Sequence, residues 1–120
     1  MTKINITSEE LSQQIVEAIQ EKKGEKIKVL DLRHLDHAIS DYFVVCEAQS
    51  KPQIDAIFDS IDELVKKNLG EDPVRVEGRE EANWILVDYF DVVAHIFKPE
   101  AREFYKLEDL WSDANITSIK

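Results

Sequence analysis

The chain has 120 residues, 43% of them hydrophobic and 33% charged, with a formal net charge of −10. This length predicts one soluble globular domain spanning residues 1–120. The acidic excess argues against direct nucleic-acid binding, which needs clustered Lys and Arg. It is compatible with a basic protein partner, although solubility alone also explains it. No apolar run reaches the roughly 18 residues of a membrane span, and the N-terminus lacks signal-peptide features.

The single cysteine, Cys46, lies within an apolar run and excludes an intramolecular disulfide. Such cysteine usage is typical of a reducing compartment, so we expect a cytoplasmic protein with Cys46 buried in its core.

The first predicted element is a helix with clear boundary signals. Thr7 and Glu10 have the spacing of a capping box, and Gly24 is a typical residue beyond a helix end. Apolar residues then fall on one helical face: Leu11, Ile15, Ala18 and Ile19. Residues 26–32 follow as a strand rich in branched apolar side chains.

A polar connection over residues 33–40 leads to a second strand over 41–47. Five consecutive apolar residues in this strand predict burial on both faces and a central place in the sheet. Ser50 and Gln53 then have capping-box spacing at the start of a long helix, and Gly70 fits its end.

The last third of the chain predicts three short strands and a helix. The strands are expected over residues 73–77, 84–89 and 91–97, and Pro99 is placed to begin a helix that runs to about Leu107. The core is expected over about 7–112, with 113–120 as a flexible tail. The order α-β-β-α-β-β-β-α predicts an α/β (α+β) fold in which helices flank a five-stranded mixed sheet.

The two strands before Pro99 predict a hairpin with an unusual polar face. If Tyr89 and Phe90 form the link, Asp88 pairs with Asp91 and Trp84 with His95 on one face. The opposite face then holds the core residues Ile85, Val87, Val92, Ala94 and Ile96. The hairpin alone leaves open whether its two tip aromatics are packed or form a contact patch.

Three interpretations of this face remain open. The two Asp residues could shape the turn, with His95 satisfied inside the sheet. Trp84 could anchor a partner protein, since Trp is typical of binding hot spots. Asp88, Asp91 and His95 could hold a divalent metal, but their spacing matches no specific metal motif.

Other patterns of enzymatic chemistry are weak or absent. His34 and His37 lie in the polar connection, without the further ligands of a zinc protease site. The chain lacks a nucleophile elbow, a phosphate-binding loop and a dinucleotide fingerprint. We therefore predict no catalytic residue, metal or cofactor.

The C-terminal segment combines core and surface residues. Phe104, Leu107 and Leu110 are expected to pack inward. Four others are expected to stay accessible: Arg102, Tyr105, Glu108 and Trp111. A Trp near a chain end usually packs on its own domain, so Trp111 either does so or contacts a partner.

These motifs, in this order, resemble the ribosomal silencing factor (Iojap-like) family over about residues 7–112. The matching segments are 41–46, Ser50, 76–78, 84–88, 91–95, Arg102, 105–108 and 110–111. The resemblance implies a fold related to nucleotidyltransferases and a translation repressor that acts when nutrients are scarce. It implies binding to the large ribosomal subunit through ribosomal protein number fourteen, steric exclusion of the small subunit, and homodimers.

As a hypothesis, we assign the partner contact to residues of these motifs: Glu77, Gly78, Trp84, Asp88, Asp91, His95, Arg102, Tyr105, Glu108 and Trp111. The alternatives are a nucleotidyltransferase-like metal-dependent enzyme and a plain dimer-forming scaffold. The sequence departs from the family in two places. Residues 47–50 lack the glycine of the usual turn, which weakens a nucleotide site, and Tyr89-Phe90 stands where many relatives carry a glycine.

Overall fold

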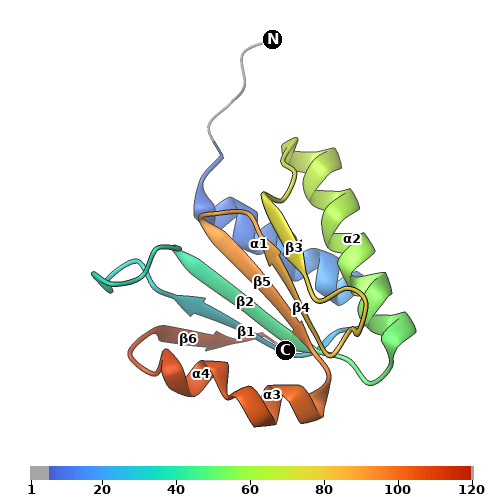
Figure 1. Cartoon of the computed structure of the whole chain (residues 1–120). Coiled ribbons are helices and arrows are strands. Elements are labelled where there is room, and N and C mark those ends of the chain that lie inside the picture. The colour runs from blue at the N-terminus through green and yellow to red at the C-terminus, as the bar shows by residue number, and fades with distance from the viewer. Residues whose placement is uncertain (1–5, 120) are drawn as a thin grey trace.

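The computed structural model describes residues 6–119 and shows a mixed α/β protein with helices on both faces of one sheet (Figure 1). Residues 1–5 and 120 of the expected domain lie outside the described residues. The elements are α1 (Ser8–Glu21), β1 (Glu25–Asp31), β2 (Tyr42–Glu47), α2 (Lys51–Leu69), β3 (Arg75–Glu77), β4 (Trp84–Asp88), β5 (Val92–Phe97), α3 (Pro99–Tyr105), α4 (Leu107–Leu110) and β6 (Asn115–Ser118).

The sheet has the strand order β3-β4-β5-β2-β1-β6. The β2–β5 pair is parallel and the other four pairs are antiparallel. Val44, Val45 and Cys46 are fully buried, which confirms the predicted central position of this strand. Burial also raises the pKa of the Cys46 thiol to about 12, because the thiolate would be desolvated.

The first predicted capping box is confirmed and the second is incomplete. The Thr7 hydroxyl accepts from the Glu10 amide at 3.0 Å, and the Glu10 carboxylate accepts from the Thr7 amide at 3.1 Å. Ser50 caps α2 in the same way, accepting from the Gln53 amide at 3.3 Å. The Gln53 side chain instead donates to the carbonyls that end α1, at Lys22 and Lys23. It therefore links the two helices.

The prediction of five strands and a loose C-terminal tail is wrong. Residues Asn115–Ser118 form β6, which pairs with β1, and the Ile119 amide donates to the Ile27 carbonyl at 2.8 Å. The side chains of β6 are all exposed, so the strand is held mainly by backbone hydrogen bonds and leaves no apolar pattern.

The predicted hairpin register is also wrong, by two residues. Trp84 pairs with Phe97, Leu86 with His95, and Asp88 with Val93. A shift of two keeps each side chain on its predicted face, because successive strand residues alternate between faces.

The longer hairpin link has a physical cause. Phe90 adopts a left-handed backbone with a φ of 76°, and its amide donates to the Asp88 carboxylate at 2.7 Å. Asp91 thus belongs to the link and not to a strand. Tyr89 is buried beneath α2, whereas Phe90 is exposed, so the two tip aromatics differ in role.

Two hydrophobic cores lie on opposite faces of the sheet. The larger one packs α1 and α2 against the sheet through aliphatic side chains such as Ile15, Ile57 and Ile61. The smaller one lies under α3 and α4 and includes Phe97 and Leu107, with Trp84 and Trp111 packed at its edge. This second core positions the residues of the candidate site.

Candidate functional site

The site is centred on a hydrogen bond between Trp84 of β4 and His95 of β5. The Trp84 indole N–H donates to His95 Nδ1 at 3.0 Å, so the neutral imidazole carries its proton on Nε2. His95 is only 3% exposed, and its Nε2 has no hydrogen-bond partner among residues 6–119. Burial lowers the pKa of His95 to about 3, so the ring is neutral at pH 7.

An aromatic row extends from this pair across the sheet face. Neighbouring rings have centroids 4.8 to 5.9 Å apart, in the order Phe104, Tyr105, Trp84, His95, Phe43, Trp111 and His37. Phe97 stacks on Trp84 beside the row, at 4.9 Å. Such ring contacts are geometrically specific, so the row fixes the relative orientation of β2, β4, β5 and the two short helices.

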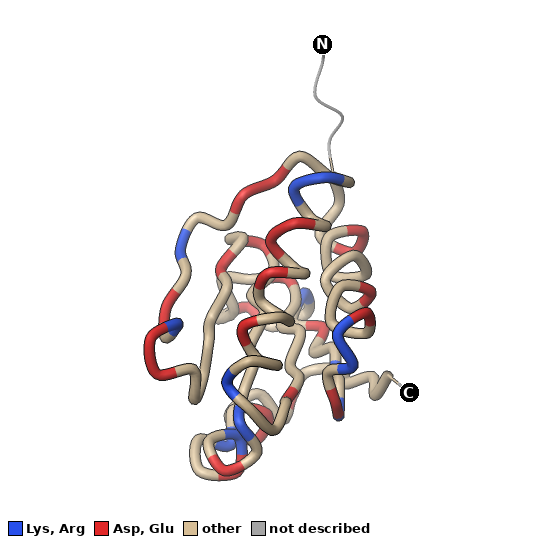
Figure 2. The backbone as a smooth tube through the Cα atoms, turned by 90° about the vertical axis from the view of Figure 1, so that its right-hand side faces the viewer, with Lys and Arg blue, Asp and Glu red and all other residues tan. Residues whose placement is uncertain are grey.

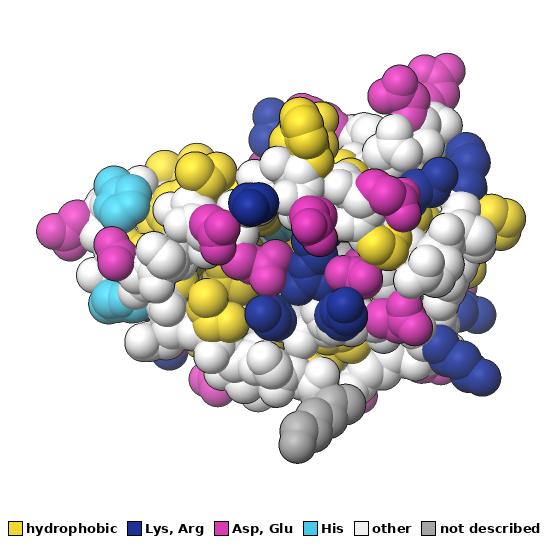
Figure 3. All heavy atoms as spheres, turned by 90° about the horizontal axis from the view of Figure 1, so that it is seen from below, with side chains coloured by type: hydrophobic (Ala, Val, Ile, Leu, Met, Phe, Trp, Pro, Cys, Tyr) yellow, Lys and Arg dark blue, Asp and Glu magenta, His cyan; other side chains and the backbone are white. Residues whose placement is uncertain are grey.

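The aromatic row is buried at its centre and exposed toward α3. Phe104 is 78% exposed and Tyr105 is 49% exposed, while Leu110 of α4 is 75% exposed. The prediction that Phe104 and Leu110 pack inward is therefore wrong. Viewed from below, this side of the molecule mixes hydrophobic side chains with acidic and basic ones (Figure 3). Exposed aromatic and aliphatic side chains of this kind are typical of binding surfaces.

Asp88 and Asp91 do not join this cluster. Trp84 and Asp88 are four residue steps apart along β4, which is about 13 Å. The Asp88 carboxylate accepts from the Phe90 amide and lies 3.5 Å from the Arg75 guanidinium. The exposed Asp91 contributes its backbone carbonyl, which accepts from the amides of residues 41 and 42. Both residues therefore shape the hairpin tip, as the first interpretation expected of them, although His95 is only partly satisfied.

Among residues 6–119, no group of three or more His, Cys, Asp and Glu side chains could hold a metal ion. For Asp88, Asp91 and His95 the reason is geometric, because the two Asp residues lie at the hairpin tip while His95 is buried further along β5, with its Nδ1 accepting from Trp84.

Arg102, expected to be accessible, is buried at 9% exposure. Its guanidinium donates to both carboxylate oxygens of Glu108, at 3.0 and 3.1 Å, and to the Glu47 carboxylate at 3.1 Å. Glu108 is partly buried, which would raise its pKa, but the Arg102 hydrogen bonds and charge lower it overall. The pair therefore remains ionised and holds α3 and α4 together.

Glu77 and Gly78 end the edge strand β3. Glu77 is exposed and pairs with Arg75 at 3.1 Å. Gly78 has a φ of +86°, and a Cβ there would overlap the carbonyl oxygen of Trp84. Gly78 is therefore needed for the close approach of this turn to β4.

Besides Phe104, which was expected to pack inward, two further members of the aromatic row were not assigned to the site from the sequence. Phe43 was assigned only to a buried strand, and His37 to a solvated connection. The rings of both contact Trp111. These contacts depend on the parallel pairing of β2 with β5 and on the path of α4, so no local pattern predicts them.

The fold and site define a class: a mixed α/β protein with a mixed sheet, helices on both faces and a partly exposed aromatic cluster beneath the short C-terminal helices. The family model described as "Ribosomal silencing factor during starvation" matches residues 5–120. The chain therefore belongs to the ribosomal silencing factor family, and its role is ribosome silencing.

Known proteins agree with this assignment. The chain is 36% identical over 115 residues to ribosomal silencing factor RsfS of Halalkalibacterium halodurans, covering 96% of this chain and 97% of that protein. It is 37% identical over 102 residues to RsfS of Bacillus subtilis, covering 85% of each. A crystal structure from Chromobacterium violaceum matches with a TM-score of 0.84 and 34% identity, covering 89% of this chain and 88% of that one.

Proposed function

We propose that this chain is a non-enzymatic translation repressor that binds the large ribosomal subunit through ribosomal protein number fourteen. The bound protein sterically blocks joining of the small subunit and lowers translation when nutrients are limiting. The observation that carries the proposal is the family match over residues 5–120. The identity of the ribosomal protein comes from the family resemblance.

The surface chemistry supports a protein partner. The exposed end of the aromatic row supplies Phe104 and Tyr105, and Leu110 adds apolar area nearby. Acidic residues are spread over the helices and loops of a chain with a net charge of −10 (Figure 2). Apolar anchors on a protein of net negative charge suit a basic ribosomal protein, because opposite charge steers encounter and the anchors supply affinity.

Five of the assigned contact residues differ in the exposure of their side chains. Trp84, Tyr105 and Trp111 have exposed or half-buried rings that can touch a partner directly. His95 and Arg102 are buried, so they act by holding other side chains in place.

The alternative of a metal-dependent nucleotidyltransferase gains no support from the acidic residues. That chemistry requires adjacent carboxylate ligands, whereas Asp88 is engaged by Arg75 and Phe90 and Asp91 lies in the hairpin link. The likeness of the fold to nucleotidyltransferases stays a prediction. Self-association as a homodimer is likewise proposed from the resemblance, and subunit binding distinguishes a repressor from a plain dimeric scaffold.

Co-sedimentation with purified large and small ribosomal subunits tests the proposal. We expect the protein to sediment with large subunits and not with small ones. Phe104→Ala should weaken large-subunit binding by more than about 1 kcal/mol, the loss typical of an aromatic anchor. Val74→Ala, at another exposed apolar residue before β3, is the matched control and should bind normally. Absence of wild-type protein from the large-subunit fraction would refute the proposal.

A further inference from the structure

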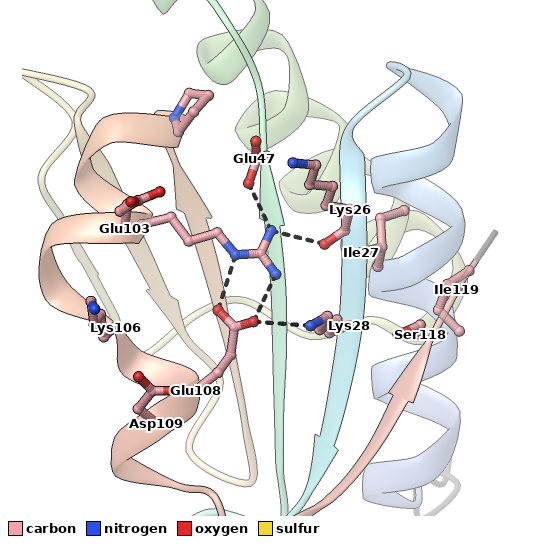
Figure 4. A pocket seen from close by; sticks show the side chains of 12 residues that line it. Lys26, Ile27, Lys28, Glu47, Glu103, Lys106, Glu108, Asp109, Ser118 and Ile119 are labelled. Carbon is pink, nitrogen blue, oxygen red and sulfur yellow. Dashed lines mark hydrogen bonds and ion pairs between the residues drawn. The ribbon is translucent and has the colours of Figure 1, made fainter.

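The guanidinium of Arg102 joins four elements and belongs to the lining of a cavity of about 550 Å³, other lining residues of which are labelled in Figure 4. It reaches from α3 to the Lys26 carbonyl of β1 at 2.9 Å and to Glu47 of β2 at 3.1 Å. It also donates to both carboxylate oxygens of Glu108 in α4, and Lys28 lies 3.5 Å from the same carboxylate. One side chain therefore ties both short helices to the centre of the sheet.

The α3–α4 corner lacks the means to hold its own shape. The two helices have 7 and 4 residues, and neither has a side-chain cap at its N-terminus. Isolated helices this short are unstable in water. Lys106 joins them with a φ of 49°, a left-handed conformation that residues other than glycine adopt at an energetic cost. The bidentate pair of Arg102 and Glu108 spans this strained residue.

A second strained residue lies at the other end of the network. Lys26 has a φ of 50°, and the pairing of β1 with β2 is irregular between Glu25 and Lys28. This bulge directs the Lys26 carbonyl to Arg102. Both strained residues are bonded to Arg102: its carbonyl accepts from the Lys106 amide, and its guanidinium donates to the Lys26 carbonyl. The Arg102 contacts therefore help to hold the backbone at both positions.

We propose that Arg102 is a positioning residue for partner binding. It fixes the α3–α4 corner so that Phe104, Tyr105 and Leu110 form one rigid docking surface. Being buried, Arg102 acts through these residues and not by contact with the partner. Lys cannot replace it fully, because only the guanidinium fork engages both Glu108 oxygens while also reaching two strands. This inference rests on the proposed ribosome-binding function.

The test combines amide hydrogen exchange with large-subunit affinity for the full chain. Arg102→Met should speed exchange in residues 99–111 by about tenfold or more, and by more than it speeds exchange in α1 and α2. It should also weaken large-subunit binding by about tenfold. Arg102→Lys should restore part of both. Should the Met variant fail to fold, Glu108→Gln, which keeps the side-chain shape, should show the same pattern at about threefold.

Ser60→Ala is the matched control. It removes a buried hydrogen bond of 2.8 Å from α2 to the Ala18 carbonyl of α1. The substitution therefore lowers the Tm of the protein through a contact on the other face of the sheet, away from α3 and α4. Its subunit affinity should be unchanged.

The inference is overturned if exchange in 99–111 is unaffected in Arg102→Met and Glu108→Gln. It is also overturned if their affinity loss does not exceed that of Ser60→Ala. Failure of the wild-type protein to bind would instead refute the proposed function, while the exchange experiment would still decide whether Arg102 positions the corner.

Discussion

The two faces of the sheet are buried in different ways. The face under α1 and α2 is aliphatic, with fully buried residues such as Ile15, Ile57 and Ile61. The face under α3 and α4 buries His95, whose Nε2–H has no partner among the described residues, and Arg102 within a charge network. Aliphatic packing provides stability, whereas buried polar groups often reduce it or leave it unchanged. The contrast indicates that the second face is shaped for function as well as for folding.

The largest expected effect is a loss of stability without a loss of binding, in a variant of the α1–α2 core. Ile61→Ala should lower the free energy of unfolding by about 2–5 kcal/mol, because it leaves a cavity in the α1–α2 core. Its subunit affinity should be normal at temperatures where the protein is folded. Trp84→Ala should instead weaken large-subunit binding by more than about 1 kcal/mol, because Trp is typical of binding hot spots. Denaturant unfolding and co-sedimentation measure the two quantities, and equal binding losses in both variants would remove the contrast between the faces.

A second effect concerns His95 and pH. Its pKa is about 3 in the folded protein against an ordinary 6.5, so below pH 6.5 the unfolded chain binds a proton that the folded protein does not. Stability is therefore fully present above pH 6.5 and falls toward pH 3, by up to about 1.4 kcal/mol per pH unit.

Denaturant unfolding from pH 7 to pH 4 checks this expectation. His95→Gln should flatten the slope in that range, because glutamine does not titrate. An unchanged slope in His95→Gln would show that His95 is not the buried titrating group.

The smallest expected effect is at the hairpin tip, outside both cores. Phe90 is exposed and has a φ of 76°, which glycine adopts without strain. Phe90→Gly should therefore raise the free energy of unfolding by about 0.5 kcal/mol. Phe90→Ala keeps the strained backbone and should give no gain. Thermal unfolding compares the two variants, and an equal shift in both would assign the effect to the lost ring.

The features that were predicted correctly carry local signals. Thr7 and Glu10 mark the start of α1 by their spacing, and Gly70 ends α2 with its left-handed backbone. The apolar run in β2 predicted its central position. The strand β6 was missed because its pairing depends on a distant segment, and the break at Lys106 was missed because no glycine marks its left-handed backbone.

The candidate site was predicted less completely than the fold. The face shared by Trp84 and His95 was correct because it depends only on strand alternation. The register was wrong because it depends on the unusual backbone of Phe90. Nothing in the sequence pattern distinguishes a buried Arg102 from an exposed one, since its partners Glu47 and Lys26 lie far away in the chain.

A subunit-joining assay tests the central proposal most directly. Purified large subunits are incubated with increasing amounts of the protein before small subunits are added, and complete ribosomes are then quantified by sedimentation. We predict that ribosome formation falls as the large subunits become saturated, and that Phe104→Ala requires a higher concentration for the same effect. Normal ribosome formation on saturated large subunits would contradict the proposal that this protein silences ribosomes by steric exclusion.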